Sequence, residues 1–422
     1  MIFLLQMLVI LAASRLCGWI VRRFLRQPQV IGEMIAGIVL GPSLFGVVAP
    51  GLQHHLFPPE SQPILNVVSQ LGISIYMFLV GLDFRADDFR SNVRGAVAVS
   101  LSGIVVPFVI AIVATPALMS VPDLFTAGVS RFNATLFFGS AIAITAFPVL
   151  ARIIHDRGIA GSAIATLCLA AAAIGDAIAW CVVAIVLASL GAGAGIALTA
   201  IGGGLLMSAV LILVGPRLFA PLGRAAERDH AAGRRVSPTI LAVALMLCML
   251  SAWVSDAIGL HAVFGAFLAG TVMPRGAFAE RLRTVLEPFT VVFLLPVFFT
   301  YSGLHTQLTL VSSPALLPIA VGILAASIFG KFVACYVAAL AAGQGNARAL
   351  GIGALMNARG LTELIIVNIG LQAGIIGTAL FSMLVLMAVV TTLMASPLFE
   401  LVYGRGARQR GEIAGKGDRF IF

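Results

Sequence analysis

The 422-residue chain is strongly apolar: 60% of its residues are hydrophobic, 10% are charged, and its mean hydropathy is +1.08. Soluble globular domains carry about 25% charged residues, so this composition excludes a soluble enzyme. The net charge of +9 would suit a nucleic-acid-binding protein, but the basic residues stand singly or in small groups between apolar runs, which is how membrane topology is encoded and indicates no nucleic-acid partner.

Thirteen apolar stretches follow one another along the chain, and crossing a bilayer as a helix takes roughly 20 such residues. In chain order these spans are 2–21, 29–48, 64–82, 96–116, 134–154, 160–190, 197–219, 237–256, 259–274, 286–304, 314–342, 349–372 and 378–402. We therefore predict an all-α, polytopic membrane protein of about 13 transmembrane helices with a short tail, 403–422.

Basic residues alternate between the two ends of these spans. With the N-terminus outside, 22 of the 26 Lys and Arg residues fall on the inner side, and Arg131 alone falls on the outer side. The positive-inside rule therefore predicts an outer N-terminus and a cytoplasmic C-terminus in the inner (plasma) membrane. No Walker or GxGxxG motif follows a strand, so we expect no nucleotide-binding domain on this chain.

Four ionisable residues fall near the middle of predicted spans: Asp176 in span 6, Lys331 in span 11, and Arg359 and Glu363 in span 12. A charge at that depth costs about 2.5–3.5 kcal/mol or more, so its presence indicates function by default. The alternative is that these residues only pair and hold the bundle together. We assign transport to Asp176 and leave both interpretations open for the other three, with Glu363 favoured as a structural partner.

Two spans carry residues that interrupt a helix at its centre. In span 5, Thr145 is followed by Pro148, which frees a carbonyl about one turn earlier. Span 12 gathers polar and flexible residues at its centre, namely Asn357, Arg359, Gly360, Thr362 and Glu363. Irregular backbone survives at this depth only where it is buried in protein or lines a water-filled cavity. A pair of broken spans therefore predicts a transporter's binding site.

The broken spans are seven crossings apart, and an odd interval reverses orientation. The same interval relates span 6 to span 13 and span 4 to span 11, so we predict inverted repeats with two crossed broken helices. Their half-helix ends, together with Asp176, would form a site for a small desolvated cation. Thr145 and Asn357 are its supporting ligands, or they only cap the broken ends.

Six motifs in order give a resemblance to a known family: QVIGEMIAGIVLGPS, YMFLVGLDF, FPVLARI, GLHAVFGAFLAG, LLPVFFTYSGL and LMNARGLTELIIVNIG. From about residue 28 to 400 the chain resembles the monovalent cation:proton antiporter-2 family, and the last three motifs resemble its branch of plant-type cation/proton exchangers. The resemblance implies a sodium/proton antiporter fold, a homodimer and elevator-like alternating access. It also implies that Asp176 binds cation and proton in turn, with Lys331 and Glu363 beside the site.

The same resemblance implies a moving core, about 96–190 and 314–402, and a dimerisation or scaffold domain, about 1–95 and 197–304. One position departs from the pattern, because many members have Asn-Asp or Asp-Asp where this chain has Gly175-Asp176. Gly175 offers neither a side-chain ligand nor a second carboxylate. A single titrating carboxylate predicts electroneutral exchange of one Na⁺ or K⁺ for one proton, without a cofactor, since a bare charge crosses the membrane interior only at high cost.

Other functions stay open from the residues alone. A cation channel would need a ring of carbonyls or acidic side chains, and no such segment occurs. An organic-anion symporter should lack the span-12 motif that this chain carries. An exporter of organic or complexed cations would differ from an exchanger of Na⁺ or K⁺ in the size of its pocket, which the sequence does not show. A membrane enzyme is disfavoured, because no Ser/His/Asp set or metal constellation converges at one depth.

Overall fold

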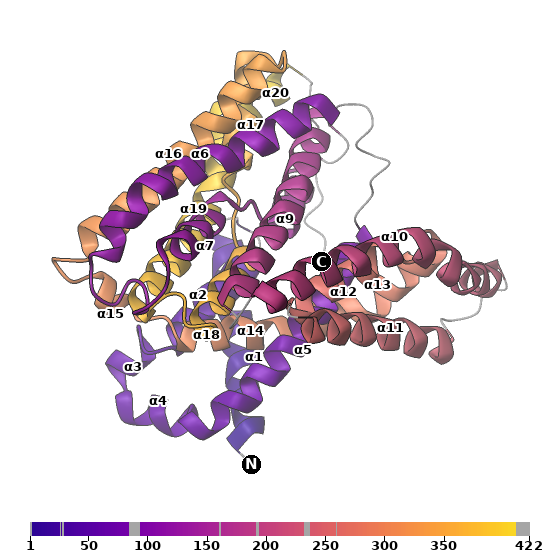
Figure 1. Ribbon diagram of the computed structural model, residues 1–422, viewed down its shortest axis with the longest axis horizontal. Coiled ribbons are helices and arrows are strands. Elements are labelled where there is room, and N and C mark those ends of the chain that lie inside the picture. Colours follow the sequence, from indigo (N-terminus) through magenta and orange to yellow (C-terminus); the bar gives the residue numbers. More distant parts are fainter. Residues whose placement is uncertain are drawn as a thin grey trace. The chain divides into compact units, whose positions relative to one another are not determined.

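The computed structural model describes residues 2–25, 27, 29–83, 93–159, 162–190, 194–231, 237–258 and 260–410. Most of these residues are helical (Figure 1), and an isolated antiparallel bridge joins Phe125 to Ile376. The all-α prediction is therefore confirmed. Several basic residues used in the topology argument, Arg85 and Arg90 among them, lie outside the described residues, as does most of the predicted tail.

The first half of the chain forms α1 (Ile2–Ile20), α2 (Gln29–Leu40), α3 (Phe45–Val48), α4 (Pro50–Leu56), α5 (Gln62–Asp83), α6 (Val93–Met119), α7 (Arg131–Ala143), α8 (Phe147–Asp156) and α9 (Ala163–Leu190). The second half forms α10 (Ala194–Ala231), α11 (Pro238–Ala257), α12 (Ala262–Thr271), α13 (Ala277–Phe289), α14 (Leu295–Leu304), α15 (Leu308–Val311), α16 (Leu317–Ala341), α17 (Asn346–Leu355), α18 (Leu361–Gln372), α19 (Thr378–Phe399) and α20 (Arg405–Gln409). Short π-helical turns extend α1, join α13 to α14, and join α19 to α20.

Of the described segments, 10 are long and apolar enough to cross a membrane. The other three predicted spans fall on shorter helices. Span 9 corresponds to α12, which has 10 residues, whereas spans 5 and 12 are each divided into two half-helices, α7 with α8 and α17 with α18. The count of thirteen crossings therefore stays a prediction, while the multi-pass membrane character is confirmed.

The chain divides into two compact units, which we call unit 1 and unit 2. Unit 1 comprises Met1–Ala12, Gly51–Arg85 and Ala184–Tyr301, and unit 2 comprises Ala13–Pro50, Ala86–Val183 and Ser302–Phe422. Residues 13–50 thus group with unit 2, although the sequence-based scaffold included them. Compactness does not say which part moves, so the division into core and scaffold stays a prediction.

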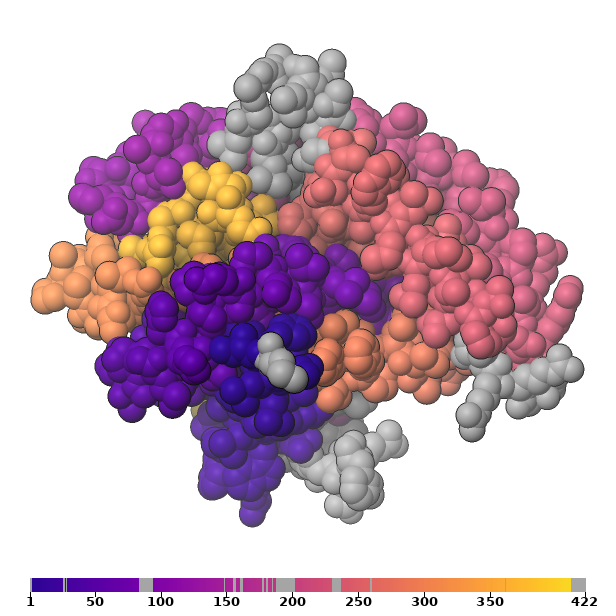
Figure 2. All heavy atoms as spheres, turned by 90° about the horizontal axis from the view of Figure 1, so that it is seen from below, coloured from indigo at the N-terminus to yellow at the C-terminus, as the bar shows by residue number. Residues whose placement is uncertain are grey.

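Unit 1 packs α5 against α12 and α13, and α10 against α11 and α13 (Figure 1). Glycines permit the closest approach: a Cβ on Gly81 of α5 would lie 2.2 Å from the carbonyl oxygen of Phe267, and one on Gly270 of α12 would lie 2.1 Å from that of Phe78. Helices α10 and α11 form a continuous part of the surface in Figure 2 and carry exposed apolar side chains such as Leu213 and Trp253. Such a surface suits contact with lipid chains.

Unit 2 contains every residue assigned to the site. Its helices α6 and α16 run side by side, and α7 packs on α6 (Figure 1). Its core is rich in alanine, with Ala170, Ala171 and Ala172 of α9 and Ala354 and Ala358 around the second break all buried. Small side chains let transmembrane helices approach closely, and the irregular residues 144–146 and 356–360 are buried.

Candidate functional site

The two interrupted helices are broken where the sequence predicted. Helix α7 ends at Ala143, Ile144 is extended with φ −68° and ψ 140°, and α8 begins at Phe147. Pro148 therefore occupies the first turn of α8, where its missing N–H costs no helical hydrogen bond. The second break lies between α17 and α18, and its last residue, Gly360, has φ +139°, a conformation that L side chains rarely adopt.

The two breaks lie against each other. The Ala146 amide donates to the carbonyl oxygen of Ala358 at 3.0 Å, and the Thr145 hydroxyl donates to that of Met356 at 2.7 Å. A Cβ on Gly360 would lie 3.0 Å from Cγ2 of Val149 in α8. These contacts satisfy polar backbone groups that cannot reach water at this depth, and they confirm the predicted crossing of the broken helices.

Thr145 and Asn357 both hydrogen-bond to carbonyls at helix ends. Thr145 donates as described above, and the Asn357 side-chain amide donates to the Gly353 carbonyl of α17 at 3.1 Å. These bonds favour the capping interpretation of the two residues, although the Asn357 Oδ1 atom is buried and has no partner among the described residues. The buried Thr362 hydroxyl likewise finds no partner in the described part of the chain.

Asp176 of α9 lies beside the N-terminus of α8. Its Oδ2 atom accepts a hydrogen bond from the Phe147 amide at 3.4 Å, and the side chain is buried, at 4% exposure. The exposed amides and the macrodipole of a helix N-terminus favour a negative charge, so α8 stabilises the ionised carboxylate. The other oxygen, Oδ1, has no hydrogen-bond partner in the described ranges. Asp176 thus presents one free oxygen that can take up a proton or a cation.

Lys331 of α16 lies at the opposite half-helix end. Its ammonium group donates a hydrogen bond to the Ala143 carbonyl, the last of α7, and the residue is 2% exposed. A cation at a helix C-terminus is stabilised by the macrodipole. Lys331 also interacts electrostatically with Asp176, Glu363 and Arg359, while its hydrogen bond goes to the Ala143 carbonyl.

Arg359 binds the same end of α7. Its guanidinium donates to the carbonyl of Ala141 at 3.0 Å, to that of Ile142 and to the Ser327 hydroxyl, and it lies 3.6 Å from Oε1 of Glu363. Both charged side chains are 0% exposed. Arg359 and Glu363 thus form a buried ion pair, and removing either partner would leave an uncompensated charge.

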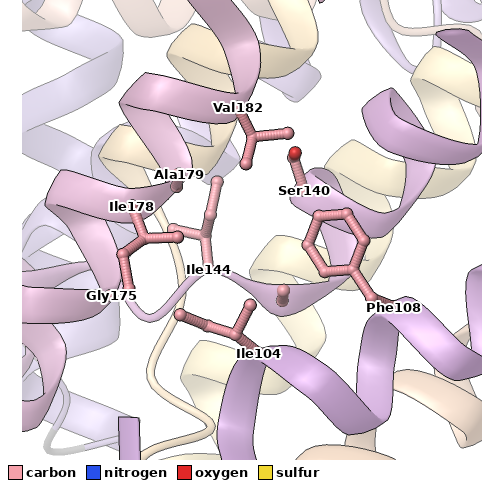
Figure 3. Close-up of a pocket in the computed structure, with 9 residues that line it drawn as sticks. Ile104, Phe108, Ser140, Ile144, Gly175, Ile178, Ala179 and Val182 are labelled. Atoms are coloured by element: carbon pink, nitrogen blue, oxygen red, sulfur yellow. The ribbon is translucent and has the colours of Figure 1, made fainter. Parts of the chain in front are cut away.

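Gly175 faces a small pocket between α6, α7 and α9 (Figure 3). Ile104 and Phe108 of α6, Ser140 of α7 and Ile178 of α9 help line it, and Ile144 of the first break points into it. The pocket is mostly apolar and has room for about one water molecule. A Cβ on Gly175 would meet the Ser100 hydroxyl of α6 at 3.6 Å, an ordinary contact.

Three polar residues of this region were missed from the sequence. Ser327 accepts from Arg359, the Thr392 hydroxyl of α19 donates to the Arg359 carbonyl at 2.8 Å, and Ser100 faces position 175. Ser327 lies one helical turn before Lys331, so its spacing could have placed it on the same face. Hydroxyl residues are common in membrane helices, and nothing local to Thr392 or Ser100 signalled a partner.

The charged residues of the site therefore lie at half-helix ends of opposite partial charge. Lys331 and Arg359 lie at the C-terminus of α7, Asp176 lies at the N-terminus of α8, and Glu363 lies in the first turn of α18. No cluster of three or more His, Cys, Asp or Glu residues that could hold a metal occurs within the described ranges. Chemically, Asp176 offers its Oδ1 atom for a proton or a small cation, whereas the Glu363 carboxylate, whose oxygens also lack a hydrogen-bond partner among the described residues, lies 3.6 Å from the cationic Arg359.

Comparison with known proteins identifies the family of this chain. The family model described as "Sodium/hydrogen exchanger, transmembrane" matches residues 11–402. The chain belongs to the sodium/hydrogen exchanger family. Among its relatives in this family, a Na⁺/H⁺ antiporter of Synechocystis, NhaS4, is 38% identical over 96% of this chain and 97% of its own length.

Other members of the exchanger family are longer. Cation/H⁺ antiporter 17 of Arabidopsis thaliana is 34% identical, and the K⁺/H⁺ antiporter 1 of Saccharomyces cerevisiae is 31% identical. They match over 96% and 95% of this chain, which spans 49% and 46% of their lengths. The resemblance to cation/proton antiporters is thus confirmed at the level of the family.

The exchanger fold is also seen in a solved structure. The sodium/proton antiporter MjNhaP1 of Methanocaldococcus jannaschii superposes with a TM-score of 0.64 over 95% of this chain and 97% of its own, at 14% identity. At that identity the likeness concerns the fold alone, and it confirms the predicted sodium/proton antiporter fold.

Proposed function

We propose that this chain is a secondary transporter, and not an enzyme, that exchanges a monovalent cation, Na⁺ or K⁺, for a proton, with Asp176 binding the two in turn. The observation that carries the proposal is the buried Asp176 carboxylate, which has one oxygen on the α8 N-terminus and one without a partner among the described residues. The family match and relatives named as Na⁺/H⁺ and K⁺/H⁺ antiporters support the exchanged ions.

The proposed cycle uses competition for one site. Release of the proton from Asp176 leaves a carboxylate that the α8 dipole stabilises, and a cation then binds Oδ1. Because a bare charge is costly in the membrane interior, the site crosses only when it is protonated or cation-loaded. Empty return is thereby suppressed, and exchange becomes obligatory. With Gly175 in place of a second carboxylate, one cation exchanges for one proton and no net charge moves.

The movement that we propose is elevator-like, with the ion-binding residues travelling as a body. Its support is that every assigned residue belongs to unit 2 and that hydrogen bonds from Thr145 and Ala146 join the two helix breaks to each other. We further propose that the protein acts as a homodimer in the bacterial plasma membrane with its N-terminus outside and its C-terminus in the cytoplasm. The match over nearly the full length of a cyanobacterial antiporter supports this location.

The central test is transport by purified protein in proteoliposomes that hold a pH gradient. Wild-type protein should dissipate the gradient when Na⁺ or K⁺ is added, and Asp176→Asn should abolish this response because an amide can neither ionise nor exchange a proton. Asp123→Asn is the matched control: it removes an exposed carboxylate, and asparagine tolerates the positive φ of 64° at that position. Normal exchange by Asp176→Asn would refute the assignment.

The same vesicles test the stoichiometry. An electroneutral exchanger should give the same rate of gradient dissipation at zero voltage and under a potassium-free diffusion potential imposed with a permeant anion. A clear dependence of the rate on voltage would exclude exchange of one proton per cation while leaving the role of Asp176 intact. Comparing Li⁺, Na⁺, K⁺ and Rb⁺ in parallel would identify the transported cation.

A further inference from the structure

Position 175 has an unusual neighbour on α6. The space that a side chain at 175 would enter, directly beside Asp176 in the sequence, is bounded by the Ser100 hydroxyl, 3.6 Å from a Cβ built on Gly175. Gly175 also borders the apolar pocket of Figure 3, which is lined by Ile104, one turn beyond Ser100 along α6. Ser100 therefore provides a polar atom next to a residue that has none.

The Ser100 hydroxyl is also unsatisfied. The residue is 2% exposed, and its oxygen has no hydrogen-bond partner in the part of the chain that the structure describes. Leaving a buried hydroxyl unpaired is unfavourable, so such groups ordinarily hold a partner. The hydroxyls of Thr145 and Thr392 differ, because both donate to backbone carbonyls, and Ser327 accepts from a cationic guanidinium.

The surrounding face of α6 points toward the charged centre. A Cβ on Gly103, one turn beyond Ser100, would lie 3.8 Å from Cε of Lys331, and the Cys335 thiol of α16 donates to the Val99 carbonyl at 3.7 Å. Ser100 is thus on the part of α6 that borders both α9, which carries Asp176, and α16, which carries Lys331. Thr362 has a free hydroxyl too, but no described contact places it against α9.

We propose that the Ser100 hydroxyl is a ligand of the transported cation, supplying from α6 the side-chain oxygen that Gly175 does not supply from α9. A dehydrated alkali cation needs several oxygen ligands, and the free Oδ1 of Asp176 provides only one of them. This inference rests on the proposed exchange function. It makes Ser100 a determinant of cation affinity and selectivity, with no part in the protonation of Asp176.

The test compares the apparent KM for cation and the maximal rate in proteoliposomes. Ser100→Ala should raise the KM for the preferred cation about three- to tenfold, the effect of one lost oxygen contact, and leave the maximal rate within about twofold. Thr115→Val is the matched control, because Thr115 is another buried hydroxyl of α6 without a described partner, about 22 Å further along the helix axis. Its KM should equal that of the wild type.

A second variant restores a hydroxyl oxygen to the proposed cation site, from α9 instead of α6. In Ser100→Ala/Gly175→Ser the hydroxyl is moved from α6 to α9, into space that a Cβ at 175 already fits, so the KM should recover toward the wild-type value. Ser100→Cys keeps the shape but offers a soft sulfur to a hard cation, and it should resemble Ser100→Ala. It replaces Ser100→Ala in the comparison if that variant does not fold.

The outcomes separate two failures. If the wild type does not exchange cations for protons, the proposed function is wrong. If the wild type exchanges and Asp176→Asn does not, but Ser100→Ala or Ser100→Cys keeps the wild-type KM and the wild-type order of cation preference, then Ser100 is not a ligand. A lower maximal rate with an unchanged KM would equally overturn the inference, because that pattern indicates a packing role.

Discussion

At the scale of single residues, the buried charges of the site lie at half-helix ends that compensate them. Asp176 receives the Phe147 amide, while Lys331 and Arg359 donate to the last carbonyls of α7. These partners offset part of the cost of placing charges inside a membrane protein. The Oδ1 atom of Asp176 has no hydrogen-bond partner among the described residues, and in the proposed cycle it is the atom on which proton and cation compete.

Competition at Asp176 sets the pH dependence of transport. Protonation occupies the site, so acidification should weaken cation binding, and alkalinity should strengthen it. Below the pH at which Asp176 is half-protonated, each unit by which the pH falls should raise the apparent KM for cation about tenfold, while a saturating cation concentration restores binding. Initial rates measured at several cation concentrations and pH values would show this. A KM that does not change with pH would place the proton on another group.

At the scale of elements, the crossing of the two broken helices is the feature on which the site depends. Part of it is readable locally, because Pro148 and Gly360 interrupt apolar spans and mark the breaks within a few residues. The charges Asp176, Lys331 and Arg359 were likewise found from their depth alone. The sequence did not show which half-helix end each charge would contact, because that depends on the tertiary packing of α9, α16 and α7.

The same limit applies to the polar neighbours. The place of Thr145 at the break left open whether it binds the cation or caps the broken helix, and the partner of its hydroxyl, the Met356 carbonyl across the crossing, could not be read from the sequence. Ser327, Thr392 and Ser100 were not identified, because a hydroxyl in an apolar helix has no local pattern that reveals its partner. Likewise, the divided spans and the short α12 explain why crossings counted by length alone differ from the predicted thirteen.

Gly360 provides the prediction for this scale. Gly360→Ala should destabilise the protein by about 1–3 kcal/mol and reduce exchange, because alanine is strained at φ +139° and its Cβ would lie 3.0 Å from Val149. Gly322→Ala in α16, where nothing lies within 4 Å, is the control and should be neutral or slightly stabilising. Thermal unfolding in detergent measures both. An unchanged midpoint for Gly360→Ala would contradict the importance of the crossing.

At the scale of the molecule, unit 2 ties the far ends of its half-helices together. The loop before α7 pairs with the loop after α18. The Thr126 amide donates to the Ile375 carbonyl at 3.2 Å, and the Gly377 amide donates to the Leu124 carbonyl at 2.9 Å. At the other end, Arg157 follows α8 and lies 3.3 Å from Glu400, beyond α19. Connections at both ends suit a site that is carried through the membrane as one body.

The Glu400 connection can be tested by removing its charge. Glu400 also pairs with Arg408 and is only 10% exposed, so Glu400→Gln should lower the free energy of unfolding by about 1–3 kcal/mol. Glu287→Gln is the control, because that carboxylate is 51% exposed and its pair with Arg283 spans 4.0 Å, a contact worth little. Equal stability of the two variants in thermal unfolding would show that the connection does not hold unit 2 together.

The claim that one carboxylate binds both ions is tested most directly by the protons released when a cation binds. Purified protein in weakly buffered detergent solution, at a pH where Asp176 is protonated, should release about one proton per chain when the transported cation is added, because the cation displaces the proton. Asp176→Asn should release none, and Asp123→Asn should match the wild type. Cation binding to the wild type without proton release, or equal release by Asp176→Asn, would contradict the account.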